Sequence, residues 1–377
     1  MNDERASREF NPLIRLGQLG QSVWYDYITR DLVTSGRLAQ LITEDGLRGM
    51  TSNPTIFDKA IAGSRLYDDD IRRLSEQGRS AAEIFEAVAV ADVRAACDVF
   101  MPLYRQSGGT AGFVSLEVSP ALANDTEGTT HEAKRLWGAV GRPNAMIKIP
   151  GTRAGLPAIA RSIAAGINVN VTLLFSVDRY AEVIDAFTEG MERRLDRGLP
   201  VQGIASVASF FVSRVDSKVD VLLDRVPDHP LRGKTAIANA CAAYGLFERA
   251  LATSRWSRLA RAGARPQRPL WASTSTKDPR LPDVHYVEAL VAPRTVNTMP
   301  PETFDAYREH GKPAVRIYEG VAAAPSQLVA LAEGGIDLNA ITRELEDEGV
   351  AKFAASYTAV LAGIEAKAEA LAVAEGG

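Results

Sequence analysis

The chain has 377 residues, of which 46% are hydrophobic and 24% are charged, and its formal net charge is −4. This composition is average for a globular protein, so it argues against a disordered, fibrous or membrane-embedded chain. The small negative charge offers no general attraction for polyanions, and we expect no nucleic-acid partner.

Short β-branched or apolar runs alternate with longer segments of helical periodicity, which is typical of βα units and a parallel sheet. We predict eight strands, at residues 22–28, 47–53, 112–118, 145–150, 167–175, 203–211, 269–274 and 294–299. Eight strands favour closure into a (β/α)8 barrel. A doubly wound Rossmann sheet is the competing topology, but no GxGxxG motif follows any of these strands.

The segments between the predicted strands are rich in Ala, Leu and Glu, so we expect them to form an outer ring of helices, with clear examples at 81–106, 130–140, 179–195 and 234–254. No fixed-period repeat or Pro- and Gly-rich linker occurs, which indicates one domain over residues 1–377.

The last segment, residues 348–372, has the periodicity of one long amphipathic helix. Its apolar face contains Val350, Phe353, Tyr357, Val360, Leu361 and Ile364. We expect this C-terminal helix to lie against the protein, where it could cover one rim of the barrel.

The N-terminal sequence MNDERASREFNPL has no apolar core of the kind that a secretory signal needs, and no run of eighteen apolar residues occurs in the chain. We therefore expect a cytoplasmic protein without a membrane span.

Cys97 and Cys241 lie in Ala-rich segments and are expected to be buried thiols. The four histidines are scattered without metal-binding spacing, so we expect no metal site.

The active site of a (β/α)8 barrel lies at the C-terminal ends of its strands, so polar residues at those positions are candidates for function. They are Asp26, the triplet Thr51-Ser52-Asn53, Glu117, Lys148, Asn170, Thr172, Ser209 and the run from Ser273 to Lys277.

Lys148 lies between Ile147 and Ile149 in a predicted central strand, so its side chain should point into the barrel. A buried lysine without a partner has a lowered pKa, and a neutral amine can attack a ketone. The resulting iminium ion permits cleavage of an adjacent carbon–carbon bond without a metal or cofactor. Structural alternatives remain open, in which Lys148 forms a buried ion pair with Glu117 or Asp26, or extends from an edge strand toward solvent.

Glu117 and Asp26 lie in other predicted strands and would face the same cavity if the barrel closes. Retro-aldol cleavage needs a base for a hydroxyl proton and a group that moves protons to the imine, and two carboxylates can divide these tasks. The alternative for each carboxylate is a helix cap or a surface ion pair.

Arg214 and Lys277 follow the sixth and seventh predicted strands, close to the position where barrels commonly bind phosphate. We expect these cations to bind a phosphosugar. The alternative is that each belongs to a solvated loop or helix face.

Five motifs occur in the order found in transaldolases: TSNPTIF, VSLEVSP, MIKIPGT, INVNVTLLFS and ASFFVSRVD. The chain therefore resembles the transaldolase family, and most closely its longer bacterial form, from about residue 16 to the C-terminal helix.

This resemblance implies a cofactor-free transferase of the non-oxidative pentose phosphate pathway. The reaction would convert sedoheptulose 7-phosphate and glyceraldehyde 3-phosphate to erythrose 4-phosphate and fructose 6-phosphate by transfer of a dihydroxyacetone unit. The expected partners are sugar phosphates, and the expected assembly is a monomer or homodimer.

The resemblance also implies catalytic roles. Lys148 resembles the lysine that forms the Schiff base with C2 of the ketose phosphate. Glu117 resembles the acid/base carboxylate, which acts through a water that Thr172 helps to hold. Asp26 resembles the carboxylate that takes the C4-hydroxyl proton.

The implied substrate contacts fall into three groups. Thr51, Asn53, Asn170 and Ser209 match positions that contact the donor or retain its enamine, Phe211 lines the pocket, and Arg214, Ser275 and Lys277 bind phosphate. The sequence departs from shorter family members around Asp26 and at Lys277, where those forms have an arginine. It is also longer near 60–110 and 218–268, where we expect additional helices.

Two rival functions remain at this point. A Schiff-base aldolase would use the same lysine but release free dihydroxyacetone, and a catalytically inactive barrel would only bind sugar phosphates. Acceptor dependence distinguishes the aldolase, and measurable turnover excludes the inactive barrel.

Overall fold

The computed structural model describes residues 11–225 and 229–376. Eight parallel strands pair in chain order and close into a barrel, which confirms the predicted fold. They are β1 (Gln21–Asp26), β2 (Gly49–Thr51), β3 (Phe113–Glu117), β4 (Ala145–Pro150), β5 (Val169–Leu174), β6 (Ser206–Phe211), β7 (Arg268–Ala272) and β8 (Thr295–Met299). Each overlaps a predicted strand.

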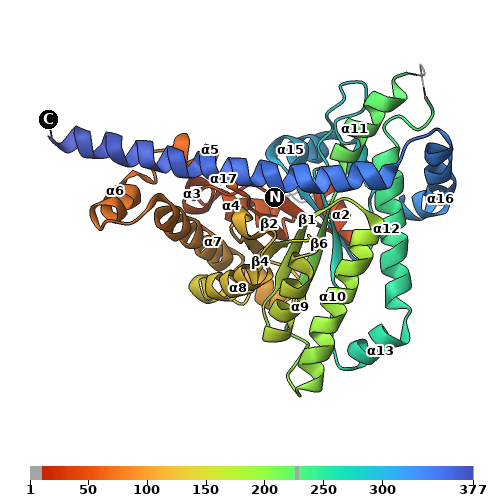
Figure 1. Ribbon diagram of the computed structural model, residues 1–377, viewed down its shortest axis with the longest axis horizontal. Coiled ribbons are helices and arrows are strands. Elements are labelled where there is room, and N and C mark those ends of the chain that lie inside the picture. The colour runs from red at the N-terminus through yellow and green to blue at the C-terminus, as the bar shows by residue number, and fades with distance from the viewer. Residues whose placement is uncertain (1–10, 226–228, 377) are drawn as a thin grey trace, which may run out of the picture.

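Helices surround this barrel (Figure 1). They are α2 (Pro12–Gln18), α3 (Arg30–Thr34), α4 (Arg37–Glu44), α5 (Pro54–Ala62), α6 (Asp68–Glu76), α7 (Ala81–Gln106), α8 (Thr126–Val140), α9 (Gly155–Ala165), α10 (Val177–Asp196), α11 (Ser213–Leu223), α12 (Thr235–Leu251), α13 (Ser254–Arg261), α14 (His285–Ala289), α15 (Pro301–His310), α16 (Ile317–Glu333) and α17 (Leu338–Gly376), with a 3-10 turn, η1 (Pro120–Leu122). The four clearest predicted helices correspond to α7, α8, α10 and α12.

The length of α7 follows from a strong start signal. Ser80 accepts a hydrogen bond from the Glu83 amide, and the Glu83 carboxylate accepts one from the Ser80 amide, which together form a capping box. Cys97 on α7 and Cys241 on α12 are buried free thiols, as predicted.

Strand register determines which side chains meet inside the barrel. Glu117 of β3 lies opposite Lys148 of β4, and Lys148 lies opposite Asn170 of β5. Residues in register on adjacent strands point to the same face of a sheet. These three side chains therefore project together into the C-terminal half of the barrel.

The C-terminal helix α17 is the long blue helix that runs across the molecule in Figure 1. Phe353, Val360 and Ile364 are buried on one face, which confirms the predicted amphipathic helix. Its N-terminal half crosses the strand ends, and ion pairs hold it there: Lys218 with Glu344 (2.6 Å) and Glu348 (2.7 Å), and Arg179 with Glu346 (3.2 Å).

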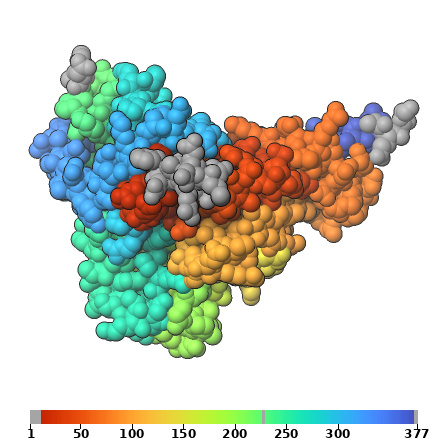
Figure 2. Space-filling view, turned by 180° about the vertical axis from the view of Figure 1, so that it is seen from behind, coloured from red at the N-terminus to blue at the C-terminus, as the bar shows by residue number. Residues whose placement is uncertain are grey.

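The far end of α17 projects from the barrel together with α5 and α6 (Figures 1 and 2). Lys367 fastens it by an ion pair with Asp68 (2.8 Å). Among the helices within residues 11–225 and 229–376, none is long and apolar enough to cross a membrane.

Candidate active site

A cavity of ≈ 210 Å³ opens at the C-terminal ends of the strands. Most of the predicted site residues line it, namely Asp26, Thr51, Asn53, Lys148, Thr172, Ser209, Phe211, Arg214, Ser275 and Lys277. Glu117 and Asn170 do not line this cavity, although both neighbour Lys148 in the barrel.

Lys148 is enclosed, with only 4% of its surface exposed. Its Nζ donates a hydrogen bond to the Ser52 carbonyl (2.9 Å) and lies 3.4 Å from Oε1 of Glu117. The amine is thus next to an acid that can exchange a proton with it. The buried ion pair considered as the structural alternative is present, and it is compatible with catalysis because the pair borders a substrate-sized cavity.

The Glu117 carboxylate lies at the end of β3, away from solvent. Burial raises its pKa, and the charge of Lys148 opposes that effect without cancelling it. Within the described residues, Oε1 of Glu117 contacts only Lys148 Nζ, while Oε2 of Glu117 and Thr172 Oγ1 have no hydrogen-bond partner. Buried polar atoms are normally satisfied, so these oxygens are available to a water or a substrate.

Asp26 lies at the end of β1 and borders the cavity. Its Oδ1 accepts a hydrogen bond from Thr51 Oγ1 (2.6 Å). Burial raises the pKa of Asp26, while the charge of Lys148 and the Thr51 hydrogen bond oppose the rise. A carboxyl group with a raised pKa can hold a proton nearer to neutral pH, as proton transfer from a substrate hydroxyl requires.

Cations border the cavity on another side. Arg214 is the second residue of α11, and its guanidinium carbon lies 5.1 Å from the centre of the Phe211 ring. Ser275 and Lys277 lie between β7 and α14, the first buried and the second exposed. The cavity thus has the enclosed amine of Lys148 and the Asp26 carboxylate in its interior, with Glu117 next to the amine, and two cations at its edge.

Comparison with known proteins identifies the family of the chain. The family model for transaldolase/fructose-6-phosphate aldolase matches residues 23–364. The chain belongs to this family. Its activity is that of a transaldolase, a transferase of the pentose phosphate pathway, as the motifs predicted.

Curated transaldolases resemble the chain over nearly its whole length. The transaldolase of Acidothermus cellulolyticus is 52% identical over 357 residues, covering 94% of this chain and 96% of that protein. That of Frankia alni is 51% identical over 355 residues, covering 93% and 96%. The transaldolase of Trichodesmium erythraeum is 44% identical over 374 residues, covering 96% and 98%.

Two asparagines expected to touch the donor have structural hydrogen bonds. Asn170 is fully buried: Nδ2 donates to Ser115 Oγ (3.0 Å), and Oδ1 accepts from Ser209 Oγ (2.7 Å). Asn53 caps α5 by accepting a hydrogen bond from the Ile56 amide (3.0 Å). Asn53 still borders the cavity, whereas Asn170 orients Ser209 from beneath it.

Several residues of this transaldolase-family site were not singled out as site residues from the sequence. Phe353 of α17 borders the cavity, and its ring centre lies 5.8 Å from Lys148 Nζ. The hydroxyl oxygen of Thr298, near the end of β8, lies 2.7 Å from the hydroxyl oxygen of Thr51. Glu302 in the first turn of α15 also lines the cavity. Strand-end position could have indicated Thr298. The position of Phe353 over the amine depends on how α17 crosses the barrel.

Unusual backbone conformations accompany the site. Leu173 has a φ of 62°, next to a register shift between Val171 and Leu174 of β5, and Ser273 has a φ of 53°. The left-handed region is uncommon for such residues and costs about 1 kcal/mol or more. The register shift adjoins Thr172, and Ser273 lies on the cavity wall, so both distortions fall where the site is built.

Proposed function

We propose that the chain transfers dihydroxyacetone through a Schiff base on Lys148. The observation that carries this proposal is the enclosed amine, 3.4 Å from Glu117 and in the same cavity as Asp26. A buried amine cannot serve as a solvated surface charge, and its access to the cavity allows a ketone to reach it.

Schiff-base formation would use the adjacent acid. The Lys148 ammonium gives a proton to Glu117, whose pKa is raised by burial, and the neutral amine attacks C2 of the ketose. Protonated Glu117 then returns the proton to the departing hydroxyl, which leaves as water. We place a water between Glu117 and Thr172 as the carrier, because the oxygens of both side chains are available for hydrogen bonds.

Carbon–carbon cleavage would use the second carboxylate. Asp26 takes the C4-hydroxyl proton, the C3–C4 bond breaks, and its electron pair neutralises the iminium ion to give an enamine. The aldose phosphate leaves, and an acceptor aldehyde takes its place. When the enamine attacks this aldehyde, Asp26 returns its proton to the new hydroxyl.

Substrate contacts follow from the cavity wall. Asn53 and Ser209 would hold donor hydroxyls, with Asn170 fixing the orientation of Ser209. The phosphate would lie against Arg214 and Lys277, with Ser275 as an additional donor and Thr51 and Phe211 completing the wall. A cation pair at one edge suits a phosphate group at one end of the sugar.

Transfer is favoured over release of free dihydroxyacetone because the similar curated proteins are named transaldolases. We further propose one domain, a cytoplasmic location and either a monomer or a homodimer. The closed barrel of eight consecutive strands supports the single domain.

The reaction can be tested by incubating the protein with fructose 6-phosphate in the presence and in the absence of erythrose 4-phosphate. We expect sedoheptulose 7-phosphate to form only with the acceptor, and little free dihydroxyacetone without it. Lys148→Ala should lower kcat by about 10⁴-fold or more, since no covalent intermediate can form. Lys134→Ala, which removes an exposed lysine of α8, is the control. Steady release of dihydroxyacetone without acceptor would instead establish the aldolase.

A further inference from the structure

The cations of the proposed phosphate site lie on two elements that are distant in the sequence. Arg214 is near the start of α11, and Lys277 lies in the segment between β7 and α14. A phosphate group contacts both cations only if these two elements hold a fixed relative position. The contacts between the elements therefore bear directly on phosphate affinity.

The first connection is direct. The Ser213 amide donates a hydrogen bond to the Ser273 carbonyl (3.0 Å), and the two hydroxyl oxygens lie 3.0 Å apart. These bonds continue the pairing of β6 with β7 beyond the strands, to the second residue after β6 and the first residue after β7. They fix the first turn of α11 but leave the chain from Ser275 onward to be held by other contacts.

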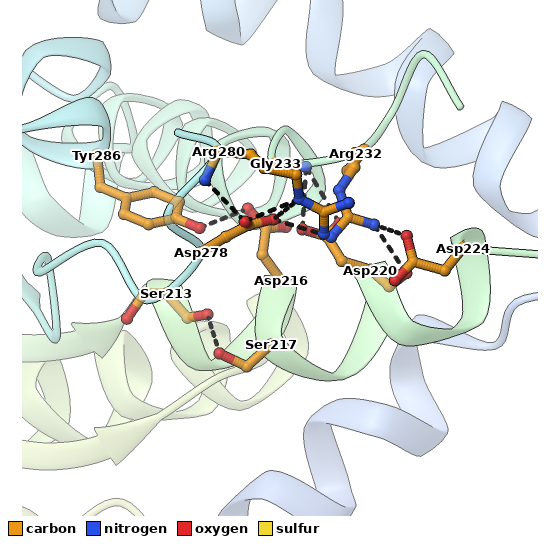
Figure 3. Close-up of polar contacts among 10 residues, drawn as sticks. All are labelled: Ser213, Asp216, Ser217, Asp220, Asp224, Arg232, Gly233, Asp278, Arg280 and Tyr286. Atoms are coloured by element: carbon orange, nitrogen blue, oxygen red, sulfur yellow. Dashed lines mark hydrogen bonds and ion pairs between the residues drawn. The ribbon is translucent and has the colours of Figure 1, made fainter. Parts of the chain in front are cut away.

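A second connection runs through Arg232, which precedes α12 (Figure 3). Its Nη2 lies 2.8 Å from Oδ2 of Asp278, the residue directly after Lys277. Its Nη1 donates to the carbonyl of Asp220 on α11 (3.4 Å) and to the carboxylate of Asp224, the residue that caps the C-terminal end of α11. The guanidinium thus spans from α11 to the neighbour of Lys277, and its fork of donors suits this bridging position.

A third connection is buried. Asp216 lies two residues after Arg214 on α11; it accepts hydrogen bonds from the Tyr286 hydroxyl (3.0 Å) and the Ala236 amide (2.7 Å). Asp216 and Tyr286 are each only 2% exposed. Figure 3 shows Tyr286 reaching from α14 toward Asp216 of α11. This bond joins the helix that carries Arg214 to the end of the segment that carries Lys277.

Burial of Asp216 is costly for the fold. None of the contacts above gives it a cationic partner, and burial raises its pKa to about 7. Burial of a carboxylate without a cationic partner is unfavourable, even when hydrogen bonds compensate part of the cost. A buried polar network that fixes the geometry of a nearby site has a functional reason to persist.

We propose that Arg232, Asp278, Asp216 and Tyr286 form a positioning network that sets the separation of Arg214 and Lys277 for a phosphate group. None of the four borders the cavity, so they act through the two cations and do not touch the substrate. This proposal rests on the proposed phosphate site. Preorganisation of the two cations lowers the cost of ordering them when the phosphate arrives.

Asp278→Asn tests the network with little change of volume, because it removes the ion pairs of Asp278 with Arg232 and Arg280. We expect the KM for fructose 6-phosphate and the inhibition constant of inorganic phosphate each to rise about 3- to 10-fold, with kcat changed less than about 2-fold. Borohydride-dependent labelling of Lys148 by dihydroxyacetone, which has no phosphate, should stay at the wild-type rate.

Tyr286→Phe probes the network at a second point and should raise the same two constants by about 2- to 4-fold. If Asp278→Asn does not fold, Tyr286→Phe decides by the same measurements. Glu192→Gln, which breaks the 2.7 Å pair with Arg255 between α10 and α13, is the matched control and should change neither constant.

Two results would overturn the network. One is unchanged phosphate inhibition in both folded variants, and the other is a loss of Lys148 labelling in proportion to the loss of phosphate affinity, which indicates general structural damage. Failure of the proposed function gives a different result, because wild-type protein would then show no labelling of Lys148 or no competitive inhibition by phosphate.

Discussion

The interior and the edge of the site are positioned by different means. In the interior, Glu117, Lys148 and Asn170 face one another because β3, β4 and β5 are in register. At the edge, Arg214 lies on α11 and Lys277 lies between β7 and α14. The separation of these two elements depends on side-chain contacts. The barrel backbone therefore sets the geometry of the proposed bond cleavage, while contacts between α11 and the segment after β7 set the geometry of the proposed phosphate binding.

Asp26→Asn changes the interior of the site and should have the largest effect on activity of the four variants described in this section. The amide cannot take the C4-hydroxyl proton, so we expect the kcat of transfer to fall about 10²- to 10⁴-fold. Labelling of Lys148 by dihydroxyacetone and borohydride should continue, because Schiff-base formation does not use Asp26. A variant that transfers normally would remove Asp26 from the cleavage step.

Arg214→Ala, at the edge, should change binding more than chemistry. The loss of one charge-assisted contact should raise the KM for fructose 6-phosphate about 10- to 100-fold, with a smaller change in kcat. Initial rates over a range of substrate concentrations separate the two parameters. If kcat falls while KM stays constant, the distinction between interior and edge does not hold for this residue.

Phe353→Leu should alter the fate of the enamine. The ring lies 5.8 Å from Lys148 Nζ, and a smaller side chain admits water to the iminium and enamine. We expect the ratio of free dihydroxyacetone to transfer product to rise about 3-fold. Simultaneous assay of both products measures this ratio, and an unchanged ratio would show that α17 does not shield the intermediate.

Asp216→Asn should change activity least among these variants and should act on stability. The pKa of Asp216 is raised to about 7, so between the usual carboxylate range and neutral pH the folded chain holds a proton that the unfolded chain releases. The free energy of unfolding contributed by this group therefore falls as pH rises through that window.

The asparagine variant lacks this titration. As pH rises through the window, the free energy of unfolding of the wild type should decrease by about 1 kcal/mol per pH unit more than that of the variant. Urea unfolding at a series of pH values measures the difference. Parallel curves for the two proteins would contradict the assigned pKa direction.

Much of the fold could be predicted because the strands and helices have distinct hydrophobic periods. The alternation of Ile147, Lys148 and Ile149 also predicted an inward-facing amine, and these three residues lie in β4 with at most 4% exposure. The hydrogen bonds of Asn170 with Ser115 and Ser209 could not be predicted, because they depend on which hydroxyl groups the adjacent strands place beside it.

Contacts between distant segments could not be predicted from the sequence, because they depend on how the folded elements pack. Phe353 lies on the predicted apolar face of α17, but its place beside Lys148 depends on the path of that helix across the barrel. Arg232 lies in the 218–268 region, where only additional helices were expected. Its ion pair with Asp278 joins residues 46 positions apart, and no local pattern indicates such a contact.

The most direct test of the central claim is borohydride reduction of the protein during incubation with fructose 6-phosphate, followed by peptide mapping. We expect a reduced dihydroxyacetone adduct on Lys148 and loss of activity in proportion to labelling. An adduct on a different lysine, or inactivation without any adduct, would contradict the account.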